Sequence, residues 1–275
     1  MADDFSAWIG KQETRHDRFD PARSNALLAA LGKPGTAKDG DPVPLLHHWL
    51  YFWDVQPPAA LGPDGHPAKG GFLPPVPLPR RMWAGGRLRF EAPLRFGEAT
   101  EKRSTILNIE TKQGRSGTLV FVTLEHRLSG SAGLAVIEQQ DLVYRAASSE
   151  TPPLPVPLSA VPPCAAHRVI SPDPVLLLRY SALTMNGHRI HYDRPYAMAE
   201  EAYPALVVHG PLQATLLAGL IEDHAGAPLK SFEFRGVSPA FDGIDLHICA
   251  APADTGFTAW TQQGEARNMV ATATV

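Results

Sequence analysis

The chain has 275 residues, of which 44% are hydrophobic and 19% are charged, enough apolar material for one large or two small globular domains. The formal net charge is −3 at pH 7, so the composition provides no broad cationic surface for nucleic acid or an anionic membrane. The two cysteines, Cys164 and Cys249, form no CxxC motif, which excludes a disulfide framework and a cysteine zinc knuckle. Residues 1–20 lack the features of a signal peptide or membrane span, so we expect a soluble, cytoplasmic protein.

The first half of the chain, residues 1–146, is predicted to consist of helices followed by strands. Residues 5–32 have apolar positions at helical spacing and predict two short helices, the second with Asp20 as N-cap and Pro21 in its first turn. After residue 86, alternating apolar positions, β-branched residues and glycine-bearing turns predict the antiparallel strands of a meander. These strands are expected within residues 87–98, 104–130 and 134–145.

Between these helices and strands, residues 35–79 are rich in proline, glycine and aromatic residues and fit no long helix or strand. They predict a long ordered loop, because their aromatic content argues against disorder. A loop of this length inside a compact domain is more often a lid or a binding segment than a linker, so we expect it to cover part of a cleft. The alternative is that Trp49, Phe52 and Trp53 close one end of the hydrophobic core.

Residues 147–164 form the clearest linker in the sequence, since their prolines cannot donate hydrogen bonds within a sheet and favour an extended spacer. The second half, residues 165–275, is predicted to repeat the order of helix and meander. It begins with an extended segment at 167–170 and continues with a helix over about residues 212–224. Four strands are then expected, near residues 230–237, 243–251, 257–263 and 267–274. Periodicity alone therefore predicts two α+β units.

Polar and titratable side chains are concentrated in residues 179–193, RYSALTMNGHRIHYD, directly after the apolar run Val175–Leu178. This segment resembles the signature of the MaoC-like hot-dog hydratases and dehydratases, which follows the pattern D-x-N-P-[LIV]-H. The resemblance is closest to the mesaconyl-C4-CoA hydratases and to the mitochondrial 3-hydroxyacyl-thioester dehydratases. Here the frame reads NGHRIH, with Asn186 at the position of the general-base Asp. An amide cannot take up a proton, so the base must be sought elsewhere.

The resemblance implies an α+β double hot-dog fold, with two antiparallel sheets each wrapped on a helix and the signature in the second half. It also implies reversible hydration of an α,β-unsaturated acyl-CoA without a cofactor, by a monomer or a homodimer. The leading substrate is a short branched dicarboxylic thioester such as mesaconyl-C4-CoA. Three alternatives stay open: a 3-hydroxyacyl-thioester dehydratase of fatty-acid synthesis, a hot-dog thioesterase, and a non-catalytic acyl-CoA-binding protein. Asn186 opposes the thioesterase and favours the non-catalytic protein, which the paired histidines oppose.

His188 and His191 are the candidate acid and base. By resemblance, His191 falls on the catalytic His of the family pattern, while His188 and Arg189 stand at its Asn and Pro positions. Imidazole titrates near neutral pH, so the histidines could hold and activate water while Asn186 orients it. A His pair at this spacing could also bind a metal, but no third ligand is evident and no metal is expected. The alternative is that both histidines satisfy buried carbonyls.

The segment His209–Gly210 precedes Pro211 at the start of the predicted apolar helix. The first N–H groups of a helix have no partner within it and lie at the positive end of its dipole. By resemblance, the amide of Gly210 points at the thioester carbonyl, so Gly210 is the candidate oxyanion-type donor. His209 and Arg189 are the neighbouring candidates for substrate binding. The alternative for Gly210 is a hinge with positive φ.

Asp193 precedes Arg194 and Pro195 and is predicted to cap a helix in preference to acting in catalysis. Candidate contacts to the CoA moiety are basic residues that could equally be solvated surface charges, so no phosphate clamp is assigned. These residues are Lys69, Arg80, Arg81 and Arg235.

Overall fold

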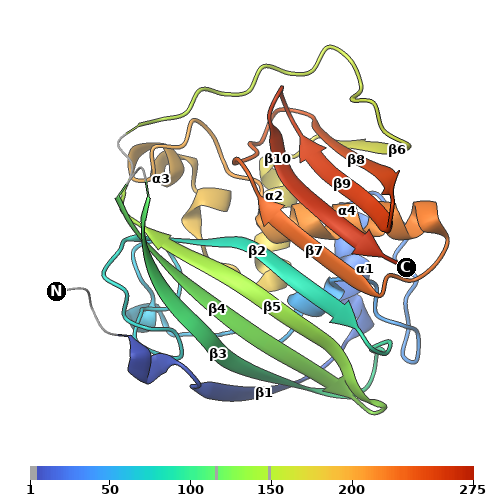
Figure 1. The fold of residues 1–275 in the computed structure, drawn as a ribbon, viewed down its shortest axis with the longest axis horizontal. Helices are drawn as coiled ribbons and strands as arrows, with labels where there is room; N and C mark the ends of the chain where they lie inside the picture. Colours follow the sequence, from blue (N-terminus) through green and yellow to red (C-terminus); the bar gives the residue numbers. More distant parts are fainter. Residues whose placement is uncertain (1–4, 115–116, 148–149) are drawn as a thin grey trace.

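The computed structural model describes residues 5–114, 117–147 and 150–275 (Figure 1). Residues 1–4, residues 115–116 in the predicted turn between strands, and residues 148–149 in the predicted linker lie outside this description. The α-helices are α1 (Pro21–Ala30), α2 (Pro174–Thr184), α3 (Arg194–Ala199) and α4 (Gly210–Ala225), and the 3-10 turns are η1 (Ser6–Trp8), η2 (His47–Leu50), η3 (Pro58–Ala60) and η4 (Arg189–His191). The strands are β1 (Gln12–Arg18), β2 (Arg80–Phe90), β3 (Ala99–Gly114), β4 (Gly117–Gly130), β5 (Gly133–Arg145), β6 (Ala166–Ile170), β7 (Ser231–Gly236), β8 (Leu246–Ala253), β9 (Gly256–Gln262) and β10 (Arg267–Thr274).

The ten strands of the described residues form one antiparallel sheet in the order β1-β3-β4-β5-β2-β7-β10-β9-β8-β6. The two halves of the chain join where β2 pairs with β7, which sets Gly85 opposite Arg235. A Cβ atom on Gly85 would lie 2.6 Å from the carbonyl oxygen of Phe234, so a larger residue would prevent this close approach. The α+β prediction is confirmed, and the two predicted sheets are joined edge to edge.

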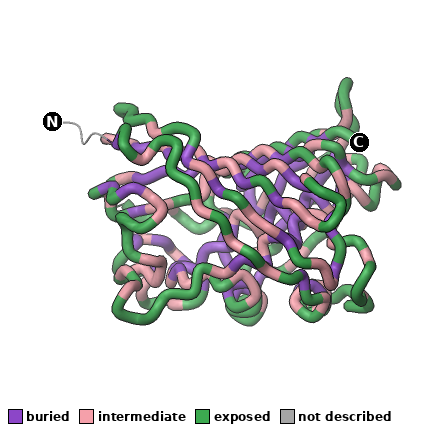
Figure 2. Tube along the Cα trace, turned by 90° about the horizontal axis from the view of Figure 1, so that it is seen from below, coloured by how far each residue is buried: buried purple, intermediate pink, exposed green. Residues whose placement is uncertain are grey.

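Helices and ordered loops cover one face of the sheet, and the buried segments gather where the sheet faces them (Figure 2). In the second half, α4 packs on β6, β8, β9 and β10. In the first half, the short α1 packs against α2 and η2. Buried residues of both halves, including Phe19, Leu88, Leu217 and Phe232, belong to one hydrophobic cluster. No helix of the described residues is long and apolar enough to cross a membrane.

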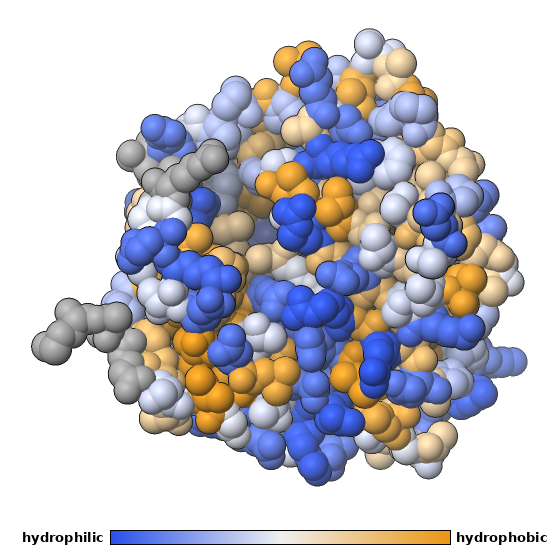
Figure 3. All heavy atoms as spheres, in the orientation of Figure 1, coloured by the Kyte–Doolittle hydropathy of each residue, from blue (hydrophilic) through white to orange (hydrophobic). Residues whose placement is uncertain are grey.

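The opposite face of the sheet is open to solvent and carries hydrophilic side chains across its middle (Figure 3). On β2 and β5, Arg87 and Asp141 form an ion pair with an Nη1–Oδ2 distance of 2.7 Å, while the adjacent Leu88 is buried on the other face. This alternation is typical of an antiparallel sheet with one face on the core. The chemistry therefore has to be sought on the covered face.

Three elements differ from the predictions. The strand expected within residues 87–98 is β2, which runs from Arg80 to Phe90, because pairing with β5 and β7 extends it toward the loop and residues 91–98 turn away from the sheet. Residues 5–9 contain only the one-turn η1, and the edge strand β1 follows. The charged sequence of β1, QETRHDR, has no apolar alternation that would predict a strand. The segment before the signature turn is the helix α2, which Asp173 caps by accepting a hydrogen bond from the amide of Leu176 at 2.7 Å. By contrast, α1 begins as predicted, with Asp20 accepting from the amide of Ala22 at 2.8 Å.

The loop over residues 35–79 is ordered and serves both predicted purposes. Its first part plugs the core, since Leu46, Leu50, Tyr51 and Phe52 are all buried in the main hydrophobic cluster. Its second part, from residue 54 to residue 73, lines a large cavity. Because α1 is short, this loop takes the place of a long helix over the first half of the sheet.

Candidate active site

The signature turn begins where α2 ends, at Met185, which has the left-handed conformation with φ 52°. The backbone amide of Asn186 then donates to the carbonyl of Ser181 at 2.9 Å. The Oδ1 atom of Asn186 accepts from the backbone amide of His188 at 3.0 Å, so this oxygen is engaged in shaping the turn. The Nδ2 group of Asn186 is the donor that remains for a molecule in the cavity.

His191 is held in one orientation and one tautomer. Its Nδ1 atom donates to the carbonyl oxygen of Val207 at 2.7 Å, which leaves Nε2 as an acceptor without its own proton. The side chain is 7% exposed, and burial, together with the neighbouring His209 and His188, lowers its pKa well below the usual value of 6.5. A neutral imidazole with a free Nε2 lone pair is what a general base requires.

His209 lies behind His191, with its ring stacked on the His191 ring at a centroid distance of 3.6 Å. Its Nε2 atom is hydrogen-bonded to the Ser181 hydroxyl at 2.8 Å, and burial lowers its pKa to about 3. It is absent from the described residues that line the cavity. The predicted substrate-binding role of His209 is therefore not supported, and its packing fixes the plane of the His191 ring instead.

His188 is paired with a carboxylate that the sequence did not point to. Its Nε2 atom lies 3.1 Å from Oε1 of Glu201, and both residues are buried. Glu201 also lies 3.7 Å from Nε of Arg80, and its backbone carbonyl accepts from Nη2 of Arg80 at 2.6 Å. The acidic group missing at position 186 is thus present nearby, but it acts on His188 and not on His191.

The loop also contributes to the site. Nδ1 of His66 lies 3.0 Å from Oδ2 of Asp64, and the His66 ring lies 4.3 Å from the His188 ring. Asp64, His66 and His188 bring possible metal-ligand atoms within 4.8 Å of one another. His66 and His188 each have a ring nitrogen engaged by a carboxylate, in the second case that of Glu201. The absence of a metal stays a prediction, which metal analysis of the purified protein tests.

Two glycines bring the loop against the signature turn. A Cβ atom on Gly65 would lie 2.0 Å from the carbonyl oxygen of Gly187, and one on Gly187 would lie 2.5 Å from the carbonyl oxygen of Gly65. Gly65 also has a φ of 86°, which favours glycine. Next to this contact, the amide of Arg189 donates to the carbonyl of Asp64 at 2.9 Å. The loop and the turn therefore dock backbone to backbone.

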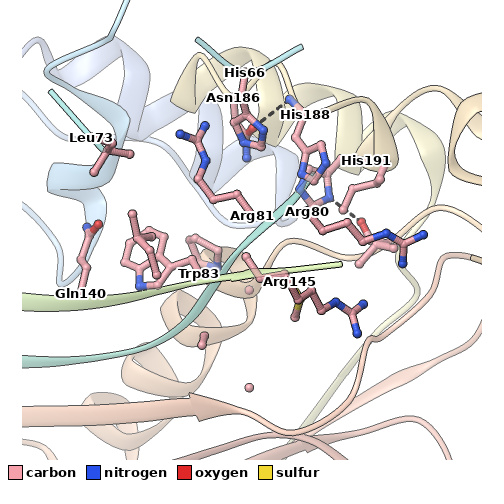
Figure 4. Close-up of a pocket in the computed structure, with 18 of the residues that line it drawn as sticks. His66, Leu73, Arg80, Arg81, Trp83, Gln140, Arg145, Asn186, His188 and His191 are labelled. Atoms are coloured by element: carbon pink, nitrogen blue, oxygen red, sulfur yellow. Dashed lines mark hydrogen bonds between the residues drawn. The ribbon is translucent and has the colours of Figure 1, made fainter. Parts of the chain in front are cut away.

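The catalytic candidates face a cavity of about 1450 Å³ between the signature turn, the start of β2 and the loop (Figure 4). Asn186, His188 and His191 line this cavity, as does Gly210. A smaller cavity of about 200 Å³ shares Asn186 with it and extends over the inner face of the first half of the sheet. Asn186 therefore stands where the two spaces meet.

Gly210 is the first residue of α4, and its amide makes no backbone hydrogen bond among the described residues. Because Pro211 has no N–H group, the amides of Gly210 and Leu212 are the donors at this helix start. The hinge alternative is wrong, since Gly210 is not among the glycines of positive φ. The geometry agrees with the predicted oxyanion-type role of Gly210, which stays a prediction.

Arg189 is not brought together with the other candidates. Its guanidinium is paired with Asp193 at 2.7 Å and donates to the carbonyl of Pro63 at 3.1 Å, outside the described lining of the cavity. The expectation that Arg189 binds substrate is therefore not supported by its position. Asp193 caps α3 as predicted, accepting from the amide of Tyr196 at 3.2 Å.

Of the basic candidates for CoA contact, Lys69, Arg80 and Arg81 line the large cavity and Arg235 does not. Figure 4 shows Arg81 reaching from β2 toward the part of the cavity that holds His66 and Asn186. Arg80 is engaged by Glu201. No phosphate clamp is evident from these positions.

The comparison with known proteins agrees with this geometry. The family described as hydroxyacyl-thioester dehydratase type 2 matches residues 46–242. A mesaconyl-C(4)-CoA hydratase of Chloroflexus aurantiacus is 47% identical over 251 residues, which are 90% of this chain and 89% of that protein. The chain belongs to the hydroxyacyl-thioester dehydratase type 2 family. The mitochondrial enzyme of that name from Schizosaccharomyces pombe is 29% identical over 230 residues, 74% of this chain and 76% of that protein.

Solved structures confirm the double hot-dog fold predicted from the signature. A MaoC-like dehydratase superposes with a TM-score of 0.72 at 13% identity, covering 98% of each chain. A Mycobacterium tuberculosis protein with a double hot-dog fold superposes with a TM-score of 0.54 at 14% identity, covering 96% of this chain and 95% of that one. With its family membership, the fold makes the protein a hydro-lyase of the hydratase and dehydratase kind.

Three parts of the site were not predicted from the sequence: His66, Glu201 and the polar group around Lys102 on the inner face of the sheet. The motif DGHP at residues 64–67 is the available signal for His66, because it places Asp and His on either side of a glycine in a loop that is predicted to cover a cleft. Glu201 and Lys102 carried no local signal, since only the fold brings them to the cavity.

Proposed function

We propose that the enzyme adds water reversibly to a short α,β-unsaturated acyl-CoA that carries a free carboxylate, of the mesaconyl-C4-CoA type. The observation that carries the proposal is the pair of Asn186 and His191 on one wall of the cavity, with His191 fixed as a neutral base by Val207. The 47% identical hydratase supports the choice of acyl group.

In the hydration direction, Nε2 of His191 accepts a proton from a water molecule as the oxygen of that water attacks the β-carbon. The Nδ2 group of Asn186 donates a hydrogen bond to the same oxygen and directs its lone pair. The electron pair of the carbon–carbon double bond moves toward the thioester carbonyl, which takes on enolate character. Asn186 can therefore replace an Asp because the only base required is His191.

The enolate oxygen needs donors, and the amide of Gly210 at the start of α4 is placed to supply one. The imidazolium of His191 then returns its proton to the α-carbon, which restores the neutral base and completes the addition of one water. Because His191 is buried, its charged form is disfavoured and proton return is driven forward. Dehydration follows the same steps in reverse.

The small volume and polar walls of the smaller cavity favour a short acyl group over the long chain that a fatty-acid dehydratase binds. Its volume of about 200 Å³ is below the roughly 300–1,000 Å³ of pockets for larger ligands. Its walls include the buried polar residues His48, His126 and Glu138, whose polarity is unsuited to a long alkyl chain.

The test is a mass-spectrometric assay of purified protein with mesaconyl-C4-CoA, itaconyl-CoA, crotonyl-CoA and a long-chain 2-enoyl-CoA, following the mass of one added water. We expect hydration of the short dicarboxylic esters first. The variant His191→Ala should lose at least about 100-fold in turnover, since a positioned general base contributes roughly 10²–10⁴-fold, while its circular dichroism stays unchanged.

Other outcomes of this assay favour the alternatives. Preference for the long-chain ester would assign the protein to fatty-acid synthesis, and release of free CoA would indicate a thioesterase. Binding of the esters without any mass change would indicate a non-catalytic acyl-CoA-binding protein. Near-normal turnover by His191→Ala would overturn the mechanism even if hydration occurs.

A further inference from the structure

The inner face of the first half of the sheet carries buried polar residues where a hydrophobic layer is usual. Along β4 and β5, His126 is 7% exposed and Glu138 is 2% exposed. On the neighbouring β3, Ser104 is buried and Lys102 lines both cavities. Such groups are costly to bury unless each has a partner, so their partners indicate what the cavity is built to hold.

Glu138 and His126 each have a hydrogen-bond partner within the protein. The carboxylate of Glu138 accepts from Nε2 of His48 at 2.9 Å and from Nε1 of Trp49 at 2.9 Å. Nε2 of Gln140 adds a third hydrogen bond to it at 2.6 Å. Burial alone would raise the pKa of Glu138, but these contacts, above all the one from His48, lower it to about 2. Glu138 is therefore an ionised carboxylate whose hydrogen-bond donors are already supplied by the protein.

Lys102 is different. No carboxylate of the described residues lies within ion-pair distance of its ammonium group, whose contact is the ring of Phe52 at 5.1 Å from Nζ to the ring centroid. Burial lowers the pKa of Lys102 and is the largest effect. Among the nearby charges, the carboxylates of Glu138, Glu13 and Asp54 raise it from a distance, and the guanidinium of Arg15 lowers it. A partly buried ammonium without an anion beside it is an unfavourable arrangement, and a ligand anion would relieve it.

The position of Lys102 relative to the reacting carbon indicates which ligand anion it meets. Lys102 and Asn186 border the same cavity of about 200 Å³, in which Lys102 is the only Lys or Arg among the described lining residues. In an acyl group of the mesaconyl-C4 type, the free carboxylate is attached to the carbon that receives the hydroxyl group and points away from the thioester. With that carbon at Asn186, the carboxylate points into the cavity that Lys102 lines.

We propose that the ammonium group of Lys102 binds the free carboxylate of the acyl group and selects dicarboxylic over monocarboxylic thioesters. This inference rests on the proposed function and adds a subsite to it. Arg81, the competing cation, lines the large cavity but not the smaller one. Arg15 is paired with Glu13 at 3.2 Å, so neither is as well placed.

The test compares mesaconyl-C4-CoA with 3-methylcrotonyl-CoA, which carries a methyl group in place of the carboxylate and is otherwise the same. In Lys102→Met, which keeps most of the aliphatic stem, kcat/KM for mesaconyl-C4-CoA should fall about 10- to 100-fold, the range for loss of a charged hydrogen bond. The value for 3-methylcrotonyl-CoA should stay within about threefold. Lys112→Met, on the exposed part of β3, is the matched control and should change neither value.

A second measurement keeps the inference testable if turnover is absent or the variant folds poorly. Binding of the two thioesters is measured by calorimetry in the His191→Ala background, with and without Lys102→Met, and Lys102→Arg is included to retain a cation. We expect a preference for mesaconyl-C4-CoA that Lys102→Met removes and Lys102→Arg retains in part. The unliganded Lys102→Met protein should also have a higher Tm, because a partly buried cation without an ion-pair partner is gone.

The two proposals fail differently. Equal losses on both thioesters in Lys102→Met, or loss of the preference in Arg81→Gln alone, would overturn the role of Lys102 and leave the hydratase standing. Hydration of 3-methylcrotonyl-CoA but not of mesaconyl-C4-CoA would overturn both the dicarboxylic substrate and the Lys102 site. If no ester is hydrated, the proposed function fails, and a binding preference that depends on Lys102 would still support the carboxylate subsite.

Discussion

At the scale of single residues, the site assigns two functions to two different side chains. Asn186 shapes the signature turn, and His191 alone provides the base. Asn186 retains the shape of the turn, because its Oδ1 atom accepts from the amide of His188 just as a carboxylate oxygen would. His191 retains the basic lone pair, because Val207 holds the proton on Nδ1. A carboxylate at position 186 is therefore unnecessary for a neutral base.

The substitution Asn186→Asp tests this division. In the wild type, burial lowers the pKa of His191 well below 6.5, so the base stays unprotonated and the acidic limb of the kcat/KM profile should lie below pH 6.5. An added carboxylate on the same turn favours the imidazolium, so the limb should move upward by about one pH unit. The exposed control Asn108→Asp should leave it in place. An unmoved limb in Asn186→Asp would show that His191 is not the titrating base.

At the scale of elements, the site depends on how the loop 35–79 docks against the signature turn. The contact uses backbone on both sides, with Gly65 and Gly187 face to face. Through this contact, His66 is brought within 4.3 Å of the His188 ring. A loop held by backbone contacts between glycines has little tolerance for side chains at those positions.

The substitution Gly65→Ala should displace the loop. Its Cβ atom would lie 2.0 Å from the carbonyl oxygen of Gly187, so we expect a lower Tm and a loss of about tenfold or more in kcat/KM, as misplaced site residues commonly cause. Gly40→Ala is the matched control, because Gly40 in the same loop has a φ of 91° but nothing within 4 Å of an added Cβ. It carries the same backbone strain without the clash. Equal effects of the two variants would exclude docking as the cause.

The elements that could be predicted from the sequence are those in which local pattern and tertiary role coincide. The helix α4 is apolar nearly all round and has Pro211 in its first turn, and the strands β7, β9 and β10 lie within two residues of their predicted limits. The strand β1 could not be predicted, since its charged residues are at the sheet edge and only pairing with β3 makes it a strand. For the same reason, the contacts of Glu201 and Lys102 with the cavity follow from the fold alone.

At the scale of the whole molecule, the two halves contribute different parts of one site. The second half supplies Asn186, His191 and the start of α4. The smaller cavity is built largely from the sheet of the first half and its loop. Pairing of β2 with β7 fixes these parts relative to one another. The short α1 leaves space over the first half of the sheet, and polar groups fill its walls. Several of these polar groups are histidines, which the protein without substrate has to bury in their uncharged form.

This leads to a prediction about stability and pH. His47, His126 and His209 are all buried, and burial lowers their pKa values to about 4, about 4 and about 3. In the unfolded chain, imidazoles take up protons below about pH 6.5. In the folded protein, the buried imidazoles take up protons only at a much lower pH. The stabilising contribution of each is complete above pH 6.5 and is lost as the pH falls toward the folded value. At pH 5, each such imidazole lowers the free energy of unfolding by about 2 kcal/mol.

Urea unfolding at pH 7.5 and pH 5.0 measures this loss. Because carboxylates titrate below this pH range, their effects on stability do not contribute to the difference. The contribution of Glu138, whose pKa is lowered to about 2, is lost only below about pH 4.5. In His47→Gln, the difference in unfolding free energy between the two pH values should shrink by about 2 kcal/mol, because one buried imidazole no longer titrates. The exposed control His16→Gln should leave that difference unchanged. A wild-type protein equally stable at both pH values would mean that these imidazoles are charged in the folded state. That result would contradict the burial of His47 and the stacking of His209 on His191.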